Sequence, residues 1–219
     1  MLRISRFATC AGATALSAAL LAPGAHANLL TNPSFEDGLN GWSAFNNVFP
    51  TSDSPRSGTE GVLLLGPFFN LPNASGLFQD VPVSPGDIVE GSMWFINDTS
   101  ITNGAGDPDI IAGTGNVVDL AIEWIDGGGN NLGQAALVQV FDGQDPNLPL
   151  DVFVQGVVTT GPAPAGAASA RLVALFVQPP TFDGGLVFAD DASVTIVPEP
   201  ATAALLGLGG LVALRRRRA

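Results

Sequence analysis

The sequence predicts an all-β protein whose body is an antiparallel β-sandwich or jelly roll, flanked by two terminal segments that lie outside this fold. Three observations predict the fold class. Short runs rich in valine, isoleucine, leucine and phenylalanine recur through the middle of the chain. Glycine and proline, 27 and 17 in number, separate these runs at short intervals. No segment of the body keeps a helical period.

The first 27 residues have the features of a secretory signal peptide. Arg3 and Arg6 give a basic start, an apolar run follows to Leu21, and Ala25-His26-Ala27 forms an A-x-A cleavage site. Signal peptidase is expected to cut after Ala27 and leave Asn28 as the new N-terminus. The alternative, a first transmembrane helix, is disfavoured because the apolar run is short and interrupted by glycine.

The predicted strands follow in order along residues 28–196, which we take as one domain. The segment 118–124 alternates, with apolar residues at even positions and Asp119, Ala121 and Glu123 on the other face. The glycine-rich segment 126–131 predicts a hairpin turn after this strand, Pro85-Gly86 predicts another turn, and 103–116 predicts a long loop. The seven predicted strands are 61–65, 88–96, 117–125, 137–141, 152–160, 172–178 and 186–197.

The last segment, 197–219, has three parts. Pro198-Glu199-Pro200 is followed by the uncharged segment 201–214 and then by four arginines, 215–218. As a helix, 201–214 would be about 21 Å long, against an apolar bilayer thickness of about 30 Å. The arginine cluster predicts that the basic end stays in the cytoplasm, with the helix as an anchor in the inner membrane.

These three parts in this order resemble the PEP-CTERM sorting signal. The resemblance implies a Gram-negative host and an exosortase that cuts near Pro198, Glu199 and Pro200. It also implies that the inner-membrane anchor is transient, and that the protein then reaches the cell surface or an exopolysaccharide, biofilm-type matrix. The alternative is a plain C-terminal anchor.

The composition of residues 28–200 excludes much chemistry. This segment holds all 20 carboxylates of the chain and two cations, Arg56 and Arg171, for a net charge of 2 − 20 = −18. The chain has no lysine, and its one histidine and one cysteine, His26 and Cys10, lie in the predicted leader. Ser-His-Asp and Cys-His catalysis, histidine–cysteine metal sites, disulfides and nucleic-acid binding are therefore excluded. Binding of a hard cation by oxygen atoms and acid/base work by a carboxylate pair remain open.

Four motifs of the body resemble carbohydrate-binding modules with the galactose-binding-like jelly-roll fold. The first and last motifs are the most specific. In chain order the motifs are 28–36 followed by Gly41-Trp42, 77–79 through to Pro85-Gly86, 123–127, and 188–194. The resemblance implies a two-sheet jelly roll over 28–196.

The same resemblance implies a structural calcium ion at one edge of the sandwich. It assigns Glu36 and either Asp190 or Asp191 as carboxylate ligands. Calcium takes six to eight oxygens, which the two ends of the domain could supply together. Backbone carbonyls would complete the shell near Asn32, Ser34 and Ser57.

Alternation along the closing strand favours Asp190 over Asp191 as the ligand. Asp190 has the parity of Phe188, Ala192 and Val194, which predicts the inward face, where an unpaired carboxylate would be costly. Asp191 would then face solvent. The alternative is that both are ordinary turn and edge carboxylates.

Trp94 is the candidate platform for a sugar ring. Trp124 has the parity of the apolar face of its strand, and Trp42 belongs to the opening motif, so both are expected in the core. Trp94 shares its face with polar residues, and sugar rings stack on aromatic surfaces fixed by polar neighbours. The alternative is a half-buried surface tryptophan. The polar candidates beside it are Glu90, Gln139 and Gln155.

These observations predict an exported, non-catalytic surface or matrix protein that binds an exopolysaccharide or another glycan. The first alternative is a purely structural matrix component with calcium as its only ligand. The second is a glycosidase or lyase that uses paired carboxylates, although nothing in the sequence marks such a pair.

Overall fold

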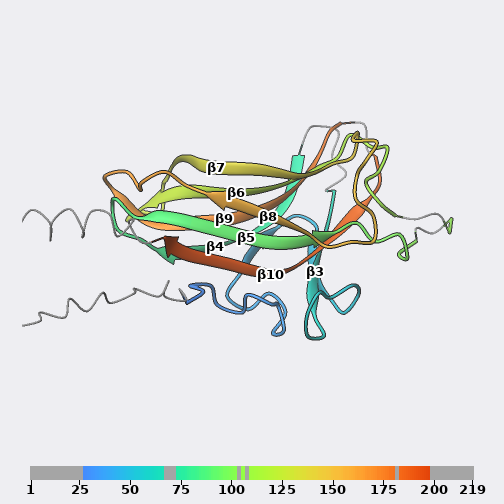
Figure 1. The fold of residues 1–219 in the computed structure, drawn as a ribbon, viewed down its shortest axis with the longest axis horizontal. Helices are drawn as coiled ribbons and strands as arrows, with labels where there is room; N and C mark the ends of the chain where they lie inside the picture. Colours follow the sequence, from blue (N-terminus) through green and yellow to red (C-terminus); the bar gives the residue numbers. More distant parts are fainter. Residues whose placement is uncertain (1–26, 67–72, 103–104, 107–108, 181–182, 198–219) are drawn as a thin grey trace, which may run out of the picture.

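The computed structural model describes residues 27–66, 73–102, 105–106, 109–180 and 183–197. Ten β-strands make up the regular secondary structure of these residues, and they form two antiparallel sheets stacked on each other (Figure 1). The predicted antiparallel sandwich is therefore confirmed. Within the described ranges there is no helix that is long and apolar enough to span a bilayer. The predicted leader, apart from Ala27, and the predicted helix 201–214 with its arginine cluster lie outside these ranges.

Each sheet contains five strands. Sheet A has the order β1-β4-β9-β6-β7, and sheet B has the order β2-β3-β10-β5-β8. The strands of sheet A are β1 (Ser43–Phe45), β4 (Asn73–Pro82), β9 (Ala167–Gln178), β6 (Val117–Asp126) and β7 (Asn131–Asp142). Those of sheet B are β2 (Val48–Thr51), β3 (Gly61–Leu65), β10 (Leu186–Val197), β5 (Ile88–Ile96) and β8 (Val154–Thr159).

All seven predicted strands are present. The bounds of β3, β5 and β10 agree with the prediction, whereas β7 and β9 begin earlier than predicted and are 12 residues long. The short strands β1 and β2, and the longer strand β4, were not among the seven predicted strands. Predicted turns are confirmed: the Asp87 N–H donates to the Ser84 carbonyl at 3.1 Å, and the Asp126 N–H donates to the Asn130 carbonyl at 3.0 Å.

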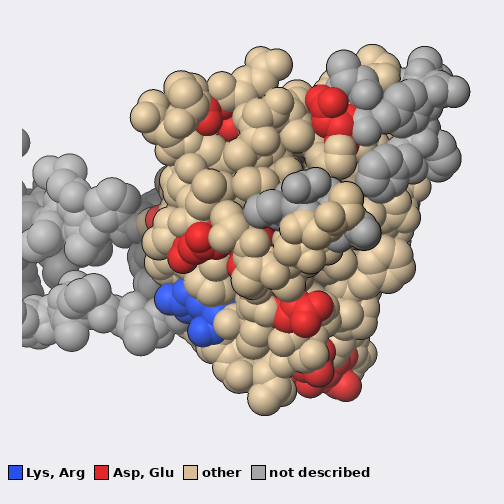
Figure 2. Space-filling model, turned by 90° about the vertical axis from the view of Figure 1, so that its right-hand side faces the viewer, with Lys and Arg blue, Asp and Glu red and all other residues tan. Residues whose placement is uncertain are grey.

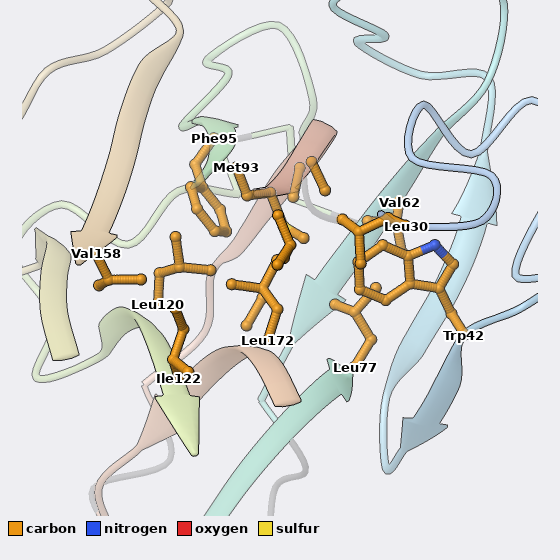
Figure 3. Close-up of a cluster of buried hydrophobic side chains, with 14 of the residues drawn as sticks. Leu30, Trp42, Val62, Leu77, Met93, Phe95, Leu120, Ile122, Val158 and Leu172 are labelled. Carbon is orange, nitrogen blue, oxygen red and sulfur yellow. The ribbon is translucent and has the colours of Figure 1, made fainter. Parts of the chain in front are cut away.

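The main core lies between the two sheets. Val118, Leu120, Ile122 and Trp124 are buried, as their alternation predicts. Fully burying one such apolar side chain stabilises the fold by about 1.5–3 kcal/mol. Figure 3 shows side chains of sheet A facing side chains of sheet B. The labelled members at the centre are Leu120, Ile122 and Leu172 from sheet A and Met93, Phe95 and Val158 from sheet B.

The two ends of the described domain meet. The Leu29 N–H donates to the Val194 carbonyl at 2.9 Å, and the Asn28 side chain both donates to the Ala192 carbonyl and accepts from the Val194 N–H. Trp42 closes the opening segment: it is 8% exposed, its ring centroid lies 5.1 Å from that of Phe35, and its indole N–H donates to a backbone carbonyl. Trp42 and Trp124 are thus core residues, as expected.

A β-bulge on β10 overturns one prediction. The register against β5 shifts between Asp190 and Ser193, and Asp191 has a φ of 47°. Because of the extra residue, Ala192 and Val194 share the inward face with Ala189, while Asp190 shares the outer face with Phe188. The predicted inward position of Asp190 is therefore wrong, although its side chain is buried.

Candidate functional site

The three predicted carboxylate ligands, Glu36, Asp190 and Asp191, all contact one loop, residues 54–60, which precedes β3. Asp190 is 0% exposed, and its Oδ2 accepts the N–H groups of Arg56 at 2.8 Å and Ser57 at 3.0 Å. Its Oδ1 accepts the N–H of Asp191 at 2.6 Å. Burial raises the pKa of Asp190, and these three N–H groups act in the opposite direction. Loop 54–60 therefore buries this carboxylate against the outer face of sheet B.

Glu36 is held by the other half of the same loop. Its carboxylate accepts the Thr59 N–H at 3.0 and 3.1 Å and the Glu60 N–H at 3.2 Å, together with the Thr59 hydroxyl at 3.1 Å. The N–H groups of Glu60 and Thr59 lower the pKa of Glu36. Gly58 is required here because its φ is 61° and a Cβ would collide with the Glu36 carboxylate.

The third carboxylate, Asp191, pairs with Arg56. Its Oδ2 lies 2.5 Å from Nη1 of Arg56, and its Oδ1 accepts the Ser57 hydroxyl at 2.7 Å. The guanidinium carbon of Arg56 lies 3.9 Å from the ring centroid of Trp94, within the range of a cation–π contact. Arg56 therefore links loop 54–60 both to β10 and to the tryptophan on β5.

The arrangement of these residues does not fit a calcium ion. Calcium needs oxygen atoms turned toward it, whereas the carboxylates of Glu36, Asp190 and Asp191 are turned toward N–H and O–H donors. In the part of the chain that the structure describes, no three acidic, histidine or cysteine side chains are grouped so that they could hold a metal.

The predicted backbone ligands do not converge either. The Asn32 carbonyl accepts the indole N–H of Trp42, and Ser57 contributes its N–H and its hydroxyl. Ser34 makes none of the hydrogen bonds of this cluster. The sequence thus identified residues that meet at one edge, but their described contacts are those of a hydrogen-bonded cluster.

The structure separates the predicted sugar-binding residues. Gln155 lies directly opposite Trp94 on β8, and Glu90 lies on the same outer face of sheet B, with the Thr159 hydroxyl 3.5 Å from its carboxylate. Gln139, by contrast, lies on β7 of sheet A, so it is not a neighbour of Trp94. The guanidinium of Arg56 lies over one face of the Trp94 ring.

The outer face of sheet A offers a different platform, which the strand register arranges in three rows. Residues directly opposite each other on neighbouring strands share a face, and successive rows lie about 7 Å apart. The middle row is apolar, and the row on one side of it is polar. The third row begins at Gly76, where the ring of Phe45 lies close to the backbone. The rows are Asp80–Arg171–Glu123–Gln134, Phe78–Val173–Ala121–Leu137 and Gly76–Leu175–Asp119–Gln139.

Arg171 is fixed at the start of the polar row. Its Nε and Nη2 donate to the two carboxylate oxygens of Asp80 at 2.7 and 2.9 Å, and its guanidinium carbon lies 4.1 Å from the ring centroid of Phe78. The hydrogen bonds to Asp80 raise the pKa of Arg171. An arginine held at both its edge and its face has a fixed orientation.

Asp119 is the residue on this face whose environment is most unusual. Its carboxyl is half-buried, burial raises its pKa, and no described residue makes a hydrogen bond to it. Gln139 lies opposite it on β7. A half-buried carboxylate without a partner costs free energy, which is a common feature of a ligand site. Sequence reasoning placed Asp119 and Glu123 on the outward face but did not propose them as site residues.

The spacing of Asp119 and Glu123 argues against a glycosidase pair. Four residues along one strand separate them by roughly 13 Å, whereas the carboxylates of inverting enzymes lie about 6.5–9.5 Å apart and those of retaining enzymes lie closer. Figure 2 shows the end of the molecule that lies on the right in Figure 1, where acidic groups are spread over the surface and the basic atoms form one small patch.

Comparison with known proteins supports the sorting tail and the fold. The profile of the PEP-CTERM protein-sorting motif matches residues 197–218, so the chain carries the sorting motif that the sequence predicted. Such a motif marks an exported protein for processing by an exosortase and for the cell surface. No curated protein matches the chain.

Three solved structures illustrate the similarity of the body to known folds. The carbohydrate-binding module TmCBM61, in complex with β-1,4-galactotriose, is 16% identical, with a TM-score of 0.50 over 78% of this chain and 99% of its own. The Stig cyclase Fisc from Fischerella sp. TAU is 14% identical, with a TM-score of 0.55 over 79% and 98%. The arabinose-bound α-L-arabinofuranosidase MgGH51 is 13% identical, with a TM-score of 0.50 over 78% of this chain and 26% of its own. At these identities the likeness shows the fold alone, a jelly-roll β-sandwich of the kind found in these three proteins.

Proposed function

We propose that this exported, exosortase-processed protein binds a neutral glycan, without catalysis, on the outer face of sheet A. The observation that carries the proposal is the row pattern of that face. The apolar row ending at Leu137 runs between the polar row that contains Arg171 and the row whose polar members are Asp119 and Gln139. A sugar ring has an apolar C–H face and a rim of hydroxyl groups, so it suits an apolar strip with hydrogen-bonding groups on both sides.

The apolar row and the row that contains Asp119 would contact different parts of the sugar. Val173 and Ala121, 6% and 3% exposed, form the low centre of the face, and Leu137, 45% exposed, extends the apolar strip toward its edge. The Asp119 carboxylate and the Gln139 amide would accept and donate hydrogen bonds to sugar hydroxyls. A hydroxyl bonded to Asp119 would supply the partner that its half-buried carboxylate lacks within the described chain.

The charge of the body favours a neutral ligand. The segment 28–200 carries a net charge of 2 − 20 = −18, and Arg171 is already paired with Asp80. An anionic polysaccharide would meet repulsion without a free cation to offset it. The sorting motif provides the setting in which such a glycan would be met, a cell surface or an exopolysaccharide matrix. A Gram-negative host, removal of the leader by signal peptidase and a transient inner-membrane anchor belong to the same proposal.

Two matched substitutions test the site. Leu137 on β7 and Val157 on β8 are both 45% exposed and lie on edge strands of opposite sheets. We expect Leu137→Ser to weaken binding to a neutral polysaccharide about fivefold, because it removes roughly 1 kcal/mol of apolar contact, and Val157→Ser to leave binding unchanged. Affinity electrophoresis of the purified protein in neutral and acidic polysaccharides measures both effects.

The same experiment separates the alternatives. If Leu137→Ser and Val157→Ser lose affinity equally, the ligand binds elsewhere. No retardation in any polysaccharide would favour a purely structural matrix component. In a separate assay, release of reducing ends from a polysaccharide would instead indicate a glycosidase or lyase.

A further inference from the structure

We propose that this chain closes the edge of its sandwich with its own N–H groups and with Arg56, at the position where the resemblance implies calcium, so that its fold does not depend on calcium. The group concerned, here called the clasp, consists of loop 54–60 together with Glu36, Asp190 and Asp191. It joins the opening segment of the domain to the closing strand β10.

The direction of the hydrogen bonds is the first argument. Four backbone N–H groups of the loop, those of Arg56, Ser57, Thr59 and Glu60, all donate to carboxylates. A calcium ion bound by these carboxylates would lie beside the positive ends of the N–H dipoles, which would repel it. The loop therefore presents the carboxylates with positive partial charge in the place of a metal.

The conformation of the loop is the second argument. Ser54 and Gly58 have φ values of 50° and 61°, in the left-handed region. Successive N–H groups of the loop turn toward one acceptor, as in an anion-binding nest: those of Arg56 and Ser57 toward Asp190, and those of Thr59 and Glu60 toward Glu36. Because a side chain at Gly58 would collide with Glu36, the loop is shaped around that carboxylate.

The place of Arg56 is the third argument. It supplies the one full positive charge of the clasp, 2.5 Å from Asp191 and over the ring of Trp94. Its side chain is 35% exposed and that of Asp191 is 21% exposed, so the pair is partly shielded from solvent. Three carboxylates at one edge would repel one another, and the guanidinium with the four N–H groups offsets this repulsion.

Thermal unfolding of the full-length protein tests the proposal, first with excess chelator and then with calcium chloride at about 10 mM, with calcium as the only added ligand. We expect the two melting temperatures to agree within about 1 °C. A calcium ion bound to the folded state at about one hundred times its Kd would raise the melting temperature by more than about 5 °C for a domain of this size, and such a rise would overturn the proposal.

Two variants make the test specific to the clasp. We expect Arg56→Met to lower the melting temperature by a few degrees in chelator, with no recovery in calcium, because the guanidinium is lost while the length of the side chain is kept. Arg171→Met removes the other paired arginine and serves as the matched control. It should lower the melting temperature less than Arg56→Met does. Recovery of Arg56→Met by calcium, or an unchanged melting temperature in that variant, would count against the proposal. No glycan is involved, so the result is independent of the proposed function.

Discussion

The two arginines of the body lie in closely similar surroundings on opposite outer faces of the sandwich. Arg56 contacts the ring of Trp94 and pairs with Asp191, and Arg171 contacts the ring of Phe78 and pairs with an aspartate on β4. The difference lies in what surrounds each pair. On sheet B, Arg56 is itself part of loop 54–60, which also buries Asp190 completely, and the partner Asp191 keeps 21% of its side chain exposed. On sheet A the partner Asp80 keeps 37% of its side chain exposed.

In both places an arginine, an aspartate and an aromatic ring are combined, and the proposed purposes of the two combinations differ. In loop 54–60, the arginine on an aromatic ring ties distant parts of the chain together. On sheet A, the same contact fixes the arginine beside an apolar strip, where the proposed function has it orient a ligand. The two proposed roles, one structural and one in binding, thus differ in the backbone that surrounds the arginine.

The largest expected difference between the faces concerns their aspartates. Asp190→Ala would leave three backbone N–H groups without acceptors in a buried place, and we expect a loss of about 3 kcal/mol in the free energy of unfolding. Asp80→Ala breaks an exposed ion pair and should cost less than about 1 kcal/mol. Urea unfolding of both variants measures the difference, and equal losses would contradict the contrast drawn here.

Removal of the two aromatic rings, Trp94 and Phe78, should affect stability and glycan binding differently. We expect Trp94→Ala to lower the free energy of unfolding by about 2 kcal/mol, because the contact with Arg56 and the packing of the ring are lost, and to leave glycan binding unchanged. Phe78→Ala should weaken glycan binding about fivefold, because Arg171 loses its fixed orientation. Titration calorimetry with a neutral oligosaccharide is the readout. If Trp94→Ala lost glycan binding and Phe78→Ala did not, the glycan site would lie on sheet B and not on sheet A.

The smallest expected effect is a difference in pH dependence. N–H groups lower the pKa of Glu36 below its ordinary 4.5, so its stabilising contribution is present above that pH and is lost as the pH falls through the lowered pKa. Burial raises the pKa of Asp119 above its ordinary 3.8, so its charged form destabilises the folded state, and this cost disappears as the pH falls through the raised pKa.

Two amide variants measure these opposite signs. Relative to the parent protein, Glu36→Gln should be less stable at neutral pH and Asp119→Asn should be at least as stable, and both differences should shrink toward acid pH. Urea unfolding from about pH 3 to about pH 7 follows them. Differences of the same sign at neutral pH would show that the two carboxylates have similar environments.

Much of the fold could be predicted from the sequence because its strands are amphipathic at short range. The alternation of 118–124 predicted the buried side of β6, and the runs at β3 and β5 gave their bounds. The short strands β1 and β2 lack such a signal, since most of their residues are exposed. The wrong face for Asp190 followed from the bulge on β10, because one extra residue reverses the parity of everything after it.

The candidate site could be predicted only in part. The sequence identified Glu36, Asp190 and Asp191 as residues that meet, and it placed Asp119 on the outward face of its strand. It proposed Gln139 as a partner of Trp94, which lies on the other sheet. It did not identify the pairing of Asp119 with Gln139, because that pairing depends on bulges between β6 and β7 that shift the register. Trp94 was chosen as a platform because its strand neighbours are polar, but the arginine that covers it comes from a distant loop.

By itself the sequence determined the all-β class, the inward side of β6, the acidic character of the body and the sorting motif at 197–218. These properties are local: they depend on composition, on a period of two residues, or on a contiguous motif. Only the tertiary structure decided which outer face is covered and which carboxylates receive N–H groups. The physical reason is distance along the chain, since Arg56 meets Asp190 across 134 residues, and no pattern within a strand encodes which loop will fold over it.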